Sequence, residues 1–123
     1  MLIYTGIDLV EIDRIKKSIK SPKFLSRVFS SQELKYFVSK SFNPSTIAAN
    51  FCAKEAFSKA LGTGIRGFSL NEVSVLRDGA GAPYILLSGK AKEAVKNRGL
   101  KLSVSLTHSK SYATAVVIAY MNN

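Results

Sequence analysis

The pattern of apolar and polar residues changes character about halfway along the chain. In the first half, after a short β-rich run ending at Asp8, apolar residues recur at helical spacing. The helices predicted from this spacing cover about residues 11–20, a short segment that opens at Pro22 and has Phe24, Leu25 and Val28 on its apolar side, a segment that follows Ser30 and runs through about Ser39, and residues 44–61. The second half predicts a hairpin over 72–77 and 84–87, a helix over 88–98, and a second hairpin over 101–106 and 112–121. Helices gathered before antiparallel strands predict an α+β domain.

Several helix boundaries carry start or stop signals. Ser21-Pro22 and Asn43-Pro44 each place a capping residue before a proline at the first helical position. Ser30 with Glu33 three residues later has the form of a capping box. Gly62 follows the long apolar helix and is a natural left-handed C-cap. The helix over 44–61 is therefore the most sharply bounded element that the sequence predicts.

Length and composition indicate one compact domain covering residues 1–123. The chain has 123 residues, 46% of them hydrophobic, which is enough apolar material for a core. One cysteine and one histidine exclude an internal disulfide framework and a zinc-type Cys/His cluster. The start of the chain lacks a basic signal region, and no apolar run approaches the roughly 18 residues of a membrane span. We expect a soluble, cytoplasmic protein.

Positive charge is concentrated in the first third of the chain. The net charge is +10, and the segment from Arg14 to Lys40 holds eight basic residues against the single acid Glu33. Such a field attracts nucleic acid, anionic lipid, a phosphorylated ligand or an acidic protein, unless it is only a solvated helix face. Composition alone does not choose among these alternatives.

Charged residues interrupt the apolar helix over 44–61 in the stretch "KEAFSK". A helix that is apolar on all sides is normally buried. Glu55 and Lys59 are four residues apart on the same side of it, where a surface salt bridge would be worth only a few tenths of a kcal/mol. Burying such a pair costs several kcal/mol per ion without partners or a metal. The pair is either an ordinary helix salt bridge or part of a site.

Asp8 has two open interpretations. It ends the β-rich run, so it could cap the following helix. Together with Glu55 it could instead supply the one or two carboxylates with which Mg²⁺ is usually held against substrate phosphates. The stretch Gly62-Thr63-Gly64 would let backbone approach a phosphate, although capping alone explains Gly62.

The remaining chemically versatile residues carry weaker signals. His108, the only histidine, falls in the turn "SLTHSKSY", where Thr107 and its neighbours offer donors to an anion, although a lone histidine in a turn is often a surface residue. Cys52 lies on the apolar helix without a second thiol or a base nearby in sequence, which predicts a core residue.

Three segments together resemble one family. They are "GIDLVEIDRI" at 6–15, "FCAKEAFSKALGTGI" at 51–65 and "SLTHSKSYATAVVI" at 105–118, in matching order and spacing. The chain resembles the holo-[acyl-carrier-protein] synthases, the small phosphopantetheinyl transferases, over essentially its whole length. The resemblance implies that family's fold and the transfer of 4′-phosphopantetheine from coenzyme A to a serine of apo acyl carrier protein, in support of fatty acid biosynthesis.

The resemblance also implies roles for individual residues. Asp8 and Glu55 would hold Mg²⁺, or Mn²⁺, against the diphosphate, Lys59 would contact the phosphate under attack, and Glu55 or a cation-bound water would take the serine proton. The implied coenzyme A contacts are Lys59, Gly62, Gly64, Pro83, Thr107 and His108. Arg14 would meet the carrier protein, and with it the basic residues Lys17, Lys20 and Arg27 of the same segment. The family implies a homotrimer with coenzyme A between subunits.

Two observations set limits on the resemblance. Many relatives have glycine four residues before the metal aspartate, where this chain has Tyr4, and the loop over 62–70 looks short. The alternative function is a small basic nucleic-acid-binding module, which would need exposed aromatic residues for base stacking. The candidates for such stacking are Phe24, Phe29, Tyr36 and Phe37. On the resemblance, however, the expected partner is the acidic carrier protein, and no nucleic acid is expected.

Overall fold

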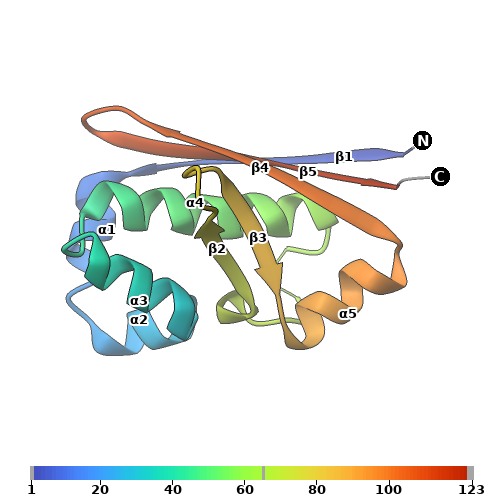
Figure 1. The fold of residues 1–123 in the computed structure, drawn as a ribbon, viewed down its shortest axis with the longest axis horizontal. Helices are drawn as coiled ribbons and strands as arrows, with labels where there is room; N and C mark the ends of the chain where they lie inside the picture. The colour runs from blue at the N-terminus through green and yellow to red at the C-terminus, as the bar shows by residue number, and fades with distance from the viewer. Residues whose placement is uncertain (1, 65, 122–123) are drawn as a thin grey trace.

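A three-stranded antiparallel sheet with a long helix beneath it forms the centre of the fold. The computed structural model describes residues 2–64 and 66–121. The strands β1 (Ile3–Glu11), β5 (Tyr112–Met121) and β4 (Leu100–His108) lie in that order, with β5 in the middle. Helix α4 (Pro44–Leu61) runs along one face of this sheet and packs against β1 and β5 (Figure 1).

The remaining elements lie beside α4 or on its side away from the sheet, and the hairpin crosses α4 so that its second strand also contacts β4 (Figure 1). They are α1 (Ile12–Ser18), α2 (Pro22–Val28), α3 (Ser31–Ser39), the 3₁₀ turn η1 (Leu70–Glu72), the hairpin β2 (Val73–Arg77) and β3 (Pro83–Leu87), and α5 (Gly89–Asn97). Mixed helices and antiparallel sheet confirm the predicted α+β class, with α4 sandwiched at its centre.

The local signals for helix ends are confirmed. The Ser21 hydroxyl accepts a hydrogen bond from the Phe24 amide, and Ser30 and Glu33 form both bonds of a capping box. Asn43 caps α4, and Gly62 ends it with φ +76°. These interactions involve neighbours in sequence, which is why the sequence reveals them.

The first strand differs from the prediction. It does not end at Asp8 but continues to Glu11, because β5 supplies a partner for every residue of β1, including Ala115 opposite Asp8. The interpretation of Asp8 as a helix cap is therefore wrong: Glu11 occupies the N-cap of α1 and makes no side-chain cap bond. Within β1, Tyr4, Gly6, Asp8 and Val10 alternate with the exposed positions, which places Asp8 on the face toward α4.

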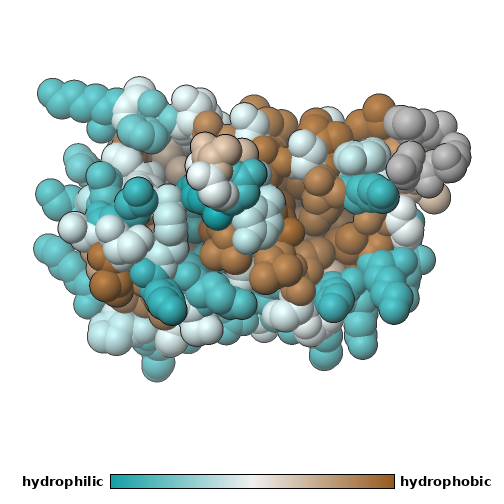
Figure 2. Space-filling model, in the orientation of Figure 1, coloured by the Kyte–Doolittle hydropathy of each residue, from teal (hydrophilic) through white to brown (hydrophobic). Residues whose placement is uncertain are grey.

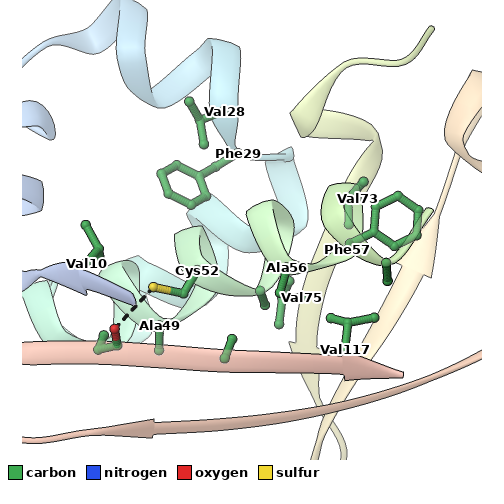
Figure 3. Close-up of a cluster of buried hydrophobic side chains, with 14 of the residues drawn as sticks. Val10, Val28, Phe29, Ala49, Cys52, Ala56, Phe57, Val73, Val75 and Val117 are labelled. Atoms are coloured by element: carbon green, nitrogen blue, oxygen red, sulfur yellow. Dashed lines mark hydrogen bonds between the residues drawn. The ribbon is translucent and has the colours of Figure 1, made fainter. Parts of the chain in front are cut away.

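The core forms where α4 meets the sheet and the elements beneath it. Side chains from α2, α4, β1, β2 and β5 meet in the cluster shown in Figure 3, including Phe29, Cys52 and Phe57. The prediction that Cys52 is a core residue is confirmed, since it is fully buried and its thiol donates to the Ala113 carbonyl. Tyr4 packs against this core, and Arg98 stacks over its ring.

A buried ion pair ties α4 to the elements beneath it. Lys54 and Glu33 are both completely buried and form a salt bridge, and the Lys54 ammonium also donates to the carbonyls of Leu70 and Val73. The Glu33 carboxylate also accepts from the Ser30 amide. Such a pair stabilises the fold only because its remaining hydrogen bonds are satisfied. Lys54 thus joins α4 to α3, η1 and β2.

Strand β1 crosses α4 at van der Waals contact, and only glycine fits at the crossing. A Cβ atom on Gly6 would lie 1.8 Å from the Ala56 carbonyl oxygen and 2.6 Å from the Ala60 nitrogen. Both atoms belong to the helix backbone, so neither can move without displacing α4. Gly6 therefore sets the distance between the strand that carries Asp8 and the helix that carries Glu55.

We predict that Gly6→Ala destabilises the protein by about 3 kcal/mol, because the added methyl group overpacks a rigid backbone contact. Urea unfolding measures the effect. Gly79→Ala is the matched control, since a Cβ atom there meets nothing within 4 Å. Equal stability of the two variants would show that the crossing tolerates a side chain.

Candidate active site

Asp8 on β1 and Glu55 on α4 are near enough for their charges to interact. Asp8 points from β1 toward the helix, and Glu55 lies one residue before Ala56, which contacts Gly6. The two side chains are close enough for the Asp8 charge to raise the pKa of Glu55. The backbone at this point is fixed, because the Thr114 hydroxyl donates to the Asp8 carbonyl at 2.6 Å.

Lys59 joins the strand and the helix at the same place. Its ammonium donates to the Ile7 carbonyl at 2.9 Å and pairs with the Asp8 carboxylate at 3.3 Å. Its side chain is 55% exposed, so most of its hydrogen-bonding capacity faces solvent. The structure does not contain the salt bridge between Glu55 and Lys59 that the sequence allowed. The buried lysine of "KEAFSK" is Lys54 instead.

The electrostatic environment of the site disfavours the charged form of Glu55. Burial raises its pKa most and the Asp8 charge raises it further, while Lys59 and Arg14 lower it and do not compensate. The same negative charges act on the neighbouring thiol, since burial and then Asp8 raise the pKa of Cys52 to about 12. Burial and the neighbouring carboxylate thus make the charged form of Glu55 costly in the absence of a bound cation.

This donor set fits a hard divalent cation. Two neighbouring carboxylates, one on a strand and one on a helix, offer the oxygen ligands that Mg²⁺ prefers, and their repulsion is relieved when a cation binds. The described residues contain no group of three or more His, Cys, Asp or Glu side chains suited to a metal. A cation held by Asp8 and Glu55 would thus keep several positions for water or for oxygens of a bound phosphate.

The residues expected to contact coenzyme A lie in two separate places. Gly62 and Gly64 line an open hollow of about 750 Å³ just after the end of α4, the helix that carries Lys59. Pro83, Thr107 and His108 line a cavity of about 320 Å³ formed by β3 and β4 with the first turns of α4. Ala49, which lines this cavity, and Gly62 are about 20 Å apart along the helix. One chain does not bring all the expected contacts together.

The basic residues of the first two helices are exposed. Arg14, Lys17, Lys20 and Arg27 all project from α1, α2 or the turn between them. Hydrophilic residues cover this end of the molecule in Figure 2, on the left. The charge of Arg14 lowers the pKa of Glu55, so this basic surface begins at the edge of the carboxylate site.

The aromatic residues of this segment are not arranged for base stacking. Phe29 and Phe37 are buried, Phe24 packs against Phe29 and Phe51, and Tyr36 is half-buried beneath Arg77. A nucleic-acid-binding module would expose such rings. Among the described residues, no helix has the length and apolar character needed to cross a membrane.

Sequence reasoning missed three residues on which this geometry depends. Gly6 was recognised only as part of a motif, Lys54 was not identified as the buried partner of Glu33, and Arg77 in the cavity was not considered. The signal for Lys54 was its position on the apolar helix, which implied a paired charge. The contacts of Gly6 and Arg77 are made with residues distant in sequence, so no local pattern reveals them.

Comparisons with known proteins agree on one family. A sequence model described as the 4′-phosphopantetheinyl transferase superfamily matches residues 4–117. The holo-[acyl-carrier-protein] synthase of Clostridium botulinum (strain Eklund 17B / Type B) is 47% identical over 92% of this chain and 93% of the relative.

Solved structures give the same result. The Helicobacter pylori holo-[acyl-carrier-protein] synthase in complex with coenzyme A matches with a TM-score of 0.82 and 38% identity, over 94% of this chain and 99% of that one. The Neisseria meningitidis enzyme matches with a TM-score of 0.88 and 30% identity, over 95% of this chain and 97% of that one.

We predict that Glu55→Gln stabilises the cation-free protein at neutral pH. Because the pKa of Glu55 is raised on folding, the folded chain holds a proton that the unfolded chain has already lost, and stability falls as the pH rises through this range. Below the ordinary glutamate value of about 4.3 the carboxyl is protonated in both states, so the benefit of the substitution disappears.

Thermal unfolding at about pH 7 and about pH 3 without divalent cations measures this difference. Glu93→Gln on the exposed face of α5 is the control, and its effect should stay within about 0.5 kcal/mol. A lower melting temperature for Glu55→Gln than for the unmodified protein at neutral pH would contradict the electrostatic account of the site.

Proposed function

The chain belongs to the holo-[acyl-carrier-protein] synthases of the 4′-phosphopantetheinyl transferase superfamily, and on that premise we propose that it modifies apo acyl carrier protein with Mg²⁺ as cofactor. In this reaction the hydroxyl oxygen of a carrier serine attacks the β-phosphorus of coenzyme A. The bond from that phosphorus to the bridging oxygen breaks, and adenosine 3′,5′-bisphosphate leaves. The observation that carries the proposal is the pair Asp8 and Glu55, with Lys59 beside it.

Asp8 and Glu55 would hold the cation, or Mn²⁺ in its place, and the coenzyme A diphosphate would complete the ligand set. The cation supplies charge neutralisation on the phosphate oxygens during transfer. The raised pKa of Glu55 supports this assignment, because burial and the Asp8 charge make its charged form costly without a bound cation. Gly6 would contribute indirectly, because its close contact with Ala56 sets the distance between β1 and α4.

Lys59 would bind the phosphate that is attacked. Its ammonium is anchored to β1 by the Ile7 carbonyl yet remains accessible, so a phosphate oxygen can be added to its existing partners. Glu55 or a cation-bound water would accept the serine proton. Positioning and charge neutralisation then supply the catalysis.

The basic surface on α1 and α2 would receive the carrier protein. Acyl carrier proteins are acidic, so opposite charge would steer them toward Arg14, Lys17, Lys20 and Arg27. Arg14 lies nearest the carboxylates, which would direct the serine of a bound carrier toward Lys59 and Glu55. Modified carrier protein would serve fatty acid biosynthesis.

A homotrimer would unite the two groups of coenzyme A contacts. The outer face of the sheet exposes a row of apolar side chains on β1, with Ile7 66% and Leu9 64% exposed, next to Val116 and Ile118 of β5. Contiguous apolar surface of this kind usually marks an interface. Packing copies on this face would let His108 of one subunit approach Lys59 of the next.

We predict that the protein transfers one phosphopantetheinyl group to an apo acyl carrier protein in the presence of coenzyme A and Mg²⁺. Intact-mass spectrometry of the carrier protein detects the transfer. Asp8→Ala and Glu55→Ala should each reduce the rate by at least about 100-fold while keeping the fold, because each removes a ligand of the cation.

The control for this assay is Glu11→Ala, which removes an exposed carboxylate from the end of the same strand. Glu11→Ala should leave the transfer rate within a factor of about two, since substitution of an exposed surface residue usually has little effect on stability. Undiminished transfer by both Asp8→Ala and Glu55→Ala would remove the cation from the mechanism.

We also predict that Ile7→Glu converts the assembly to monomers, because a charge in the apolar row opposes burial. Analytical ultracentrifugation measures the mass in solution. Val38→Glu is the matched control, since Val38 on α3 is 65% exposed but lies off the sheet. A monomeric unmodified protein, or a trimer that persists in Ile7→Glu, would refute this interface.

A further inference from the structure

Arg77 is a half-buried cation in the cavity that Pro83, Thr107 and His108 also line. Among the described residues the ion pairs are Lys54 with Glu33 and Lys59 with Asp8, so Arg77 has no carboxylate partner there. Burial lowers the pKa of Arg77, and Tyr36 and the Glu33 carboxylate, which is already paired with Lys54, offset this only in part. An anion bound in the cavity would compensate the remaining cost.

The guanidinium is held in place from the core side. Its Nη2 donates to the Oδ1 of Asn50 at 2.9 Å, and its plane lies over the Tyr36 ring with the Cζ atom 5.2 Å from the centroid. Its other contacts are long ones from Nη1 to main-chain carbonyls at 3.4 and 3.5 Å. Several of its five donors therefore remain available to a ligand.

Asn50 is itself fixed by the buried network beneath the cavity. It is completely buried, and its Nδ2 donates to the Glu33 carboxylate at 3.0 Å and to the Val75 carbonyl at 2.9 Å. Glu33 is in turn paired with Lys54. The orientation of Arg77 thus depends on a chain of satisfied polar contacts that starts at the lysine next to Glu55.

We propose that Arg77 is a specificity-determining residue that binds the 3′-phosphate of coenzyme A. This inference rests on the proposed function. Coenzyme A carries a diphosphate and a separate phosphomonoester on its ribose, and the diphosphate belongs at Asp8, Glu55 and Lys59. A guanidinium recognises the oxygens of a phosphomonoester with two parallel hydrogen bonds, which a lysine cannot reproduce.

The cavity has the composition that the nucleotide end of coenzyme A requires. His108 and the hydroxyl of Thr107 lie on the β4 side of the cavity, and Pro83 and Tyr36 contribute apolar surface. The cavity lies on the side of α4 where Asn50 meets α3 and β2, whereas Glu55 faces β1. The 3′-phosphate and the diphosphate of coenzyme A are carried by the same ribose, so a ligand bound at Arg77 would reach Asp8, Glu55 and Lys59 of a neighbouring subunit in the proposed homotrimer.

The test compares coenzyme A with dephospho-coenzyme A, which lacks only the 3′-phosphate. Isothermal titration in the presence of Mg²⁺ should show that the unmodified protein prefers coenzyme A by about 10- to 100-fold. Arg77→Gln, which keeps an amide donor for Asn50, should lose this preference by weakening coenzyme A binding alone. At saturating coenzyme A its kcat should remain within a factor of about two, since the contact is the same in the ground and transition states.

Arg98→Gln is the matched control, because Arg98 also stacks over a tyrosine, with its Cζ 5.1 Å from the Tyr4 centroid, yet lies outside the cavity. It should keep the preference for coenzyme A. Arg77→Lys should recover part of the preference through charge alone. Equal weakening of both ligands by Arg77→Gln, or an unmodified protein that binds both equally while transferring normally, would overturn the role of Arg77. Absence of transfer and of coenzyme A binding in the unmodified protein would instead overturn the proposed function.

Discussion

The close crossing of β1 over α4 is the constraint on which the site depends. Glycine at position 6 lets the strand lie directly on the helix backbone at Ala56. Pairing with β5 along the whole of β1 holds the strand in register. Asp8, two residues after Gly6, therefore lies on the same face of the strand, toward the helix. Two carboxylates from distant parts of the chain are thereby brought together against their mutual repulsion. Packing energy in the surrounding core maintains an arrangement that the charges alone would oppose.

Helix α4 serves two different charge systems on its two sides. Toward β1 it presents Glu55 and Lys59, which are partly exposed and incompletely compensated. Toward α3 and β2 it presents Asn50 and Lys54, which are fully buried and fully bonded. The stretch "KEAFSK" therefore combines a structural lysine with the two residues to which we assign the chemistry. The buried side fixes the helix, and through Asn50 it also orients Arg77 in the cavity.

The sequence predicted what depends on neighbours and on repeated patterns. The α+β class and the caps at Ser21, Ser30 and Gly62 were confirmed because their signals are local. The extent of β1 was mispredicted, because its last residues are strand only through pairing with β5, more than 100 residues away. The resemblance brought Asp8, Glu55 and Lys59 together as candidates, but the contacts of Gly6, Lys54 and Arg77 exist only in the folded chain.

The central claim is that Asp8 and Glu55 share one divalent cation that binds the coenzyme A diphosphate. Crystals grown with coenzyme A and Mn²⁺ test it directly, because anomalous scattering locates the ion. The account predicts one strong peak per chain, bonded to a carboxylate oxygen of each residue and to the diphosphate. A peak bonded to neither carboxylate, or a bound diphosphate with no ion beside it, would contradict the account.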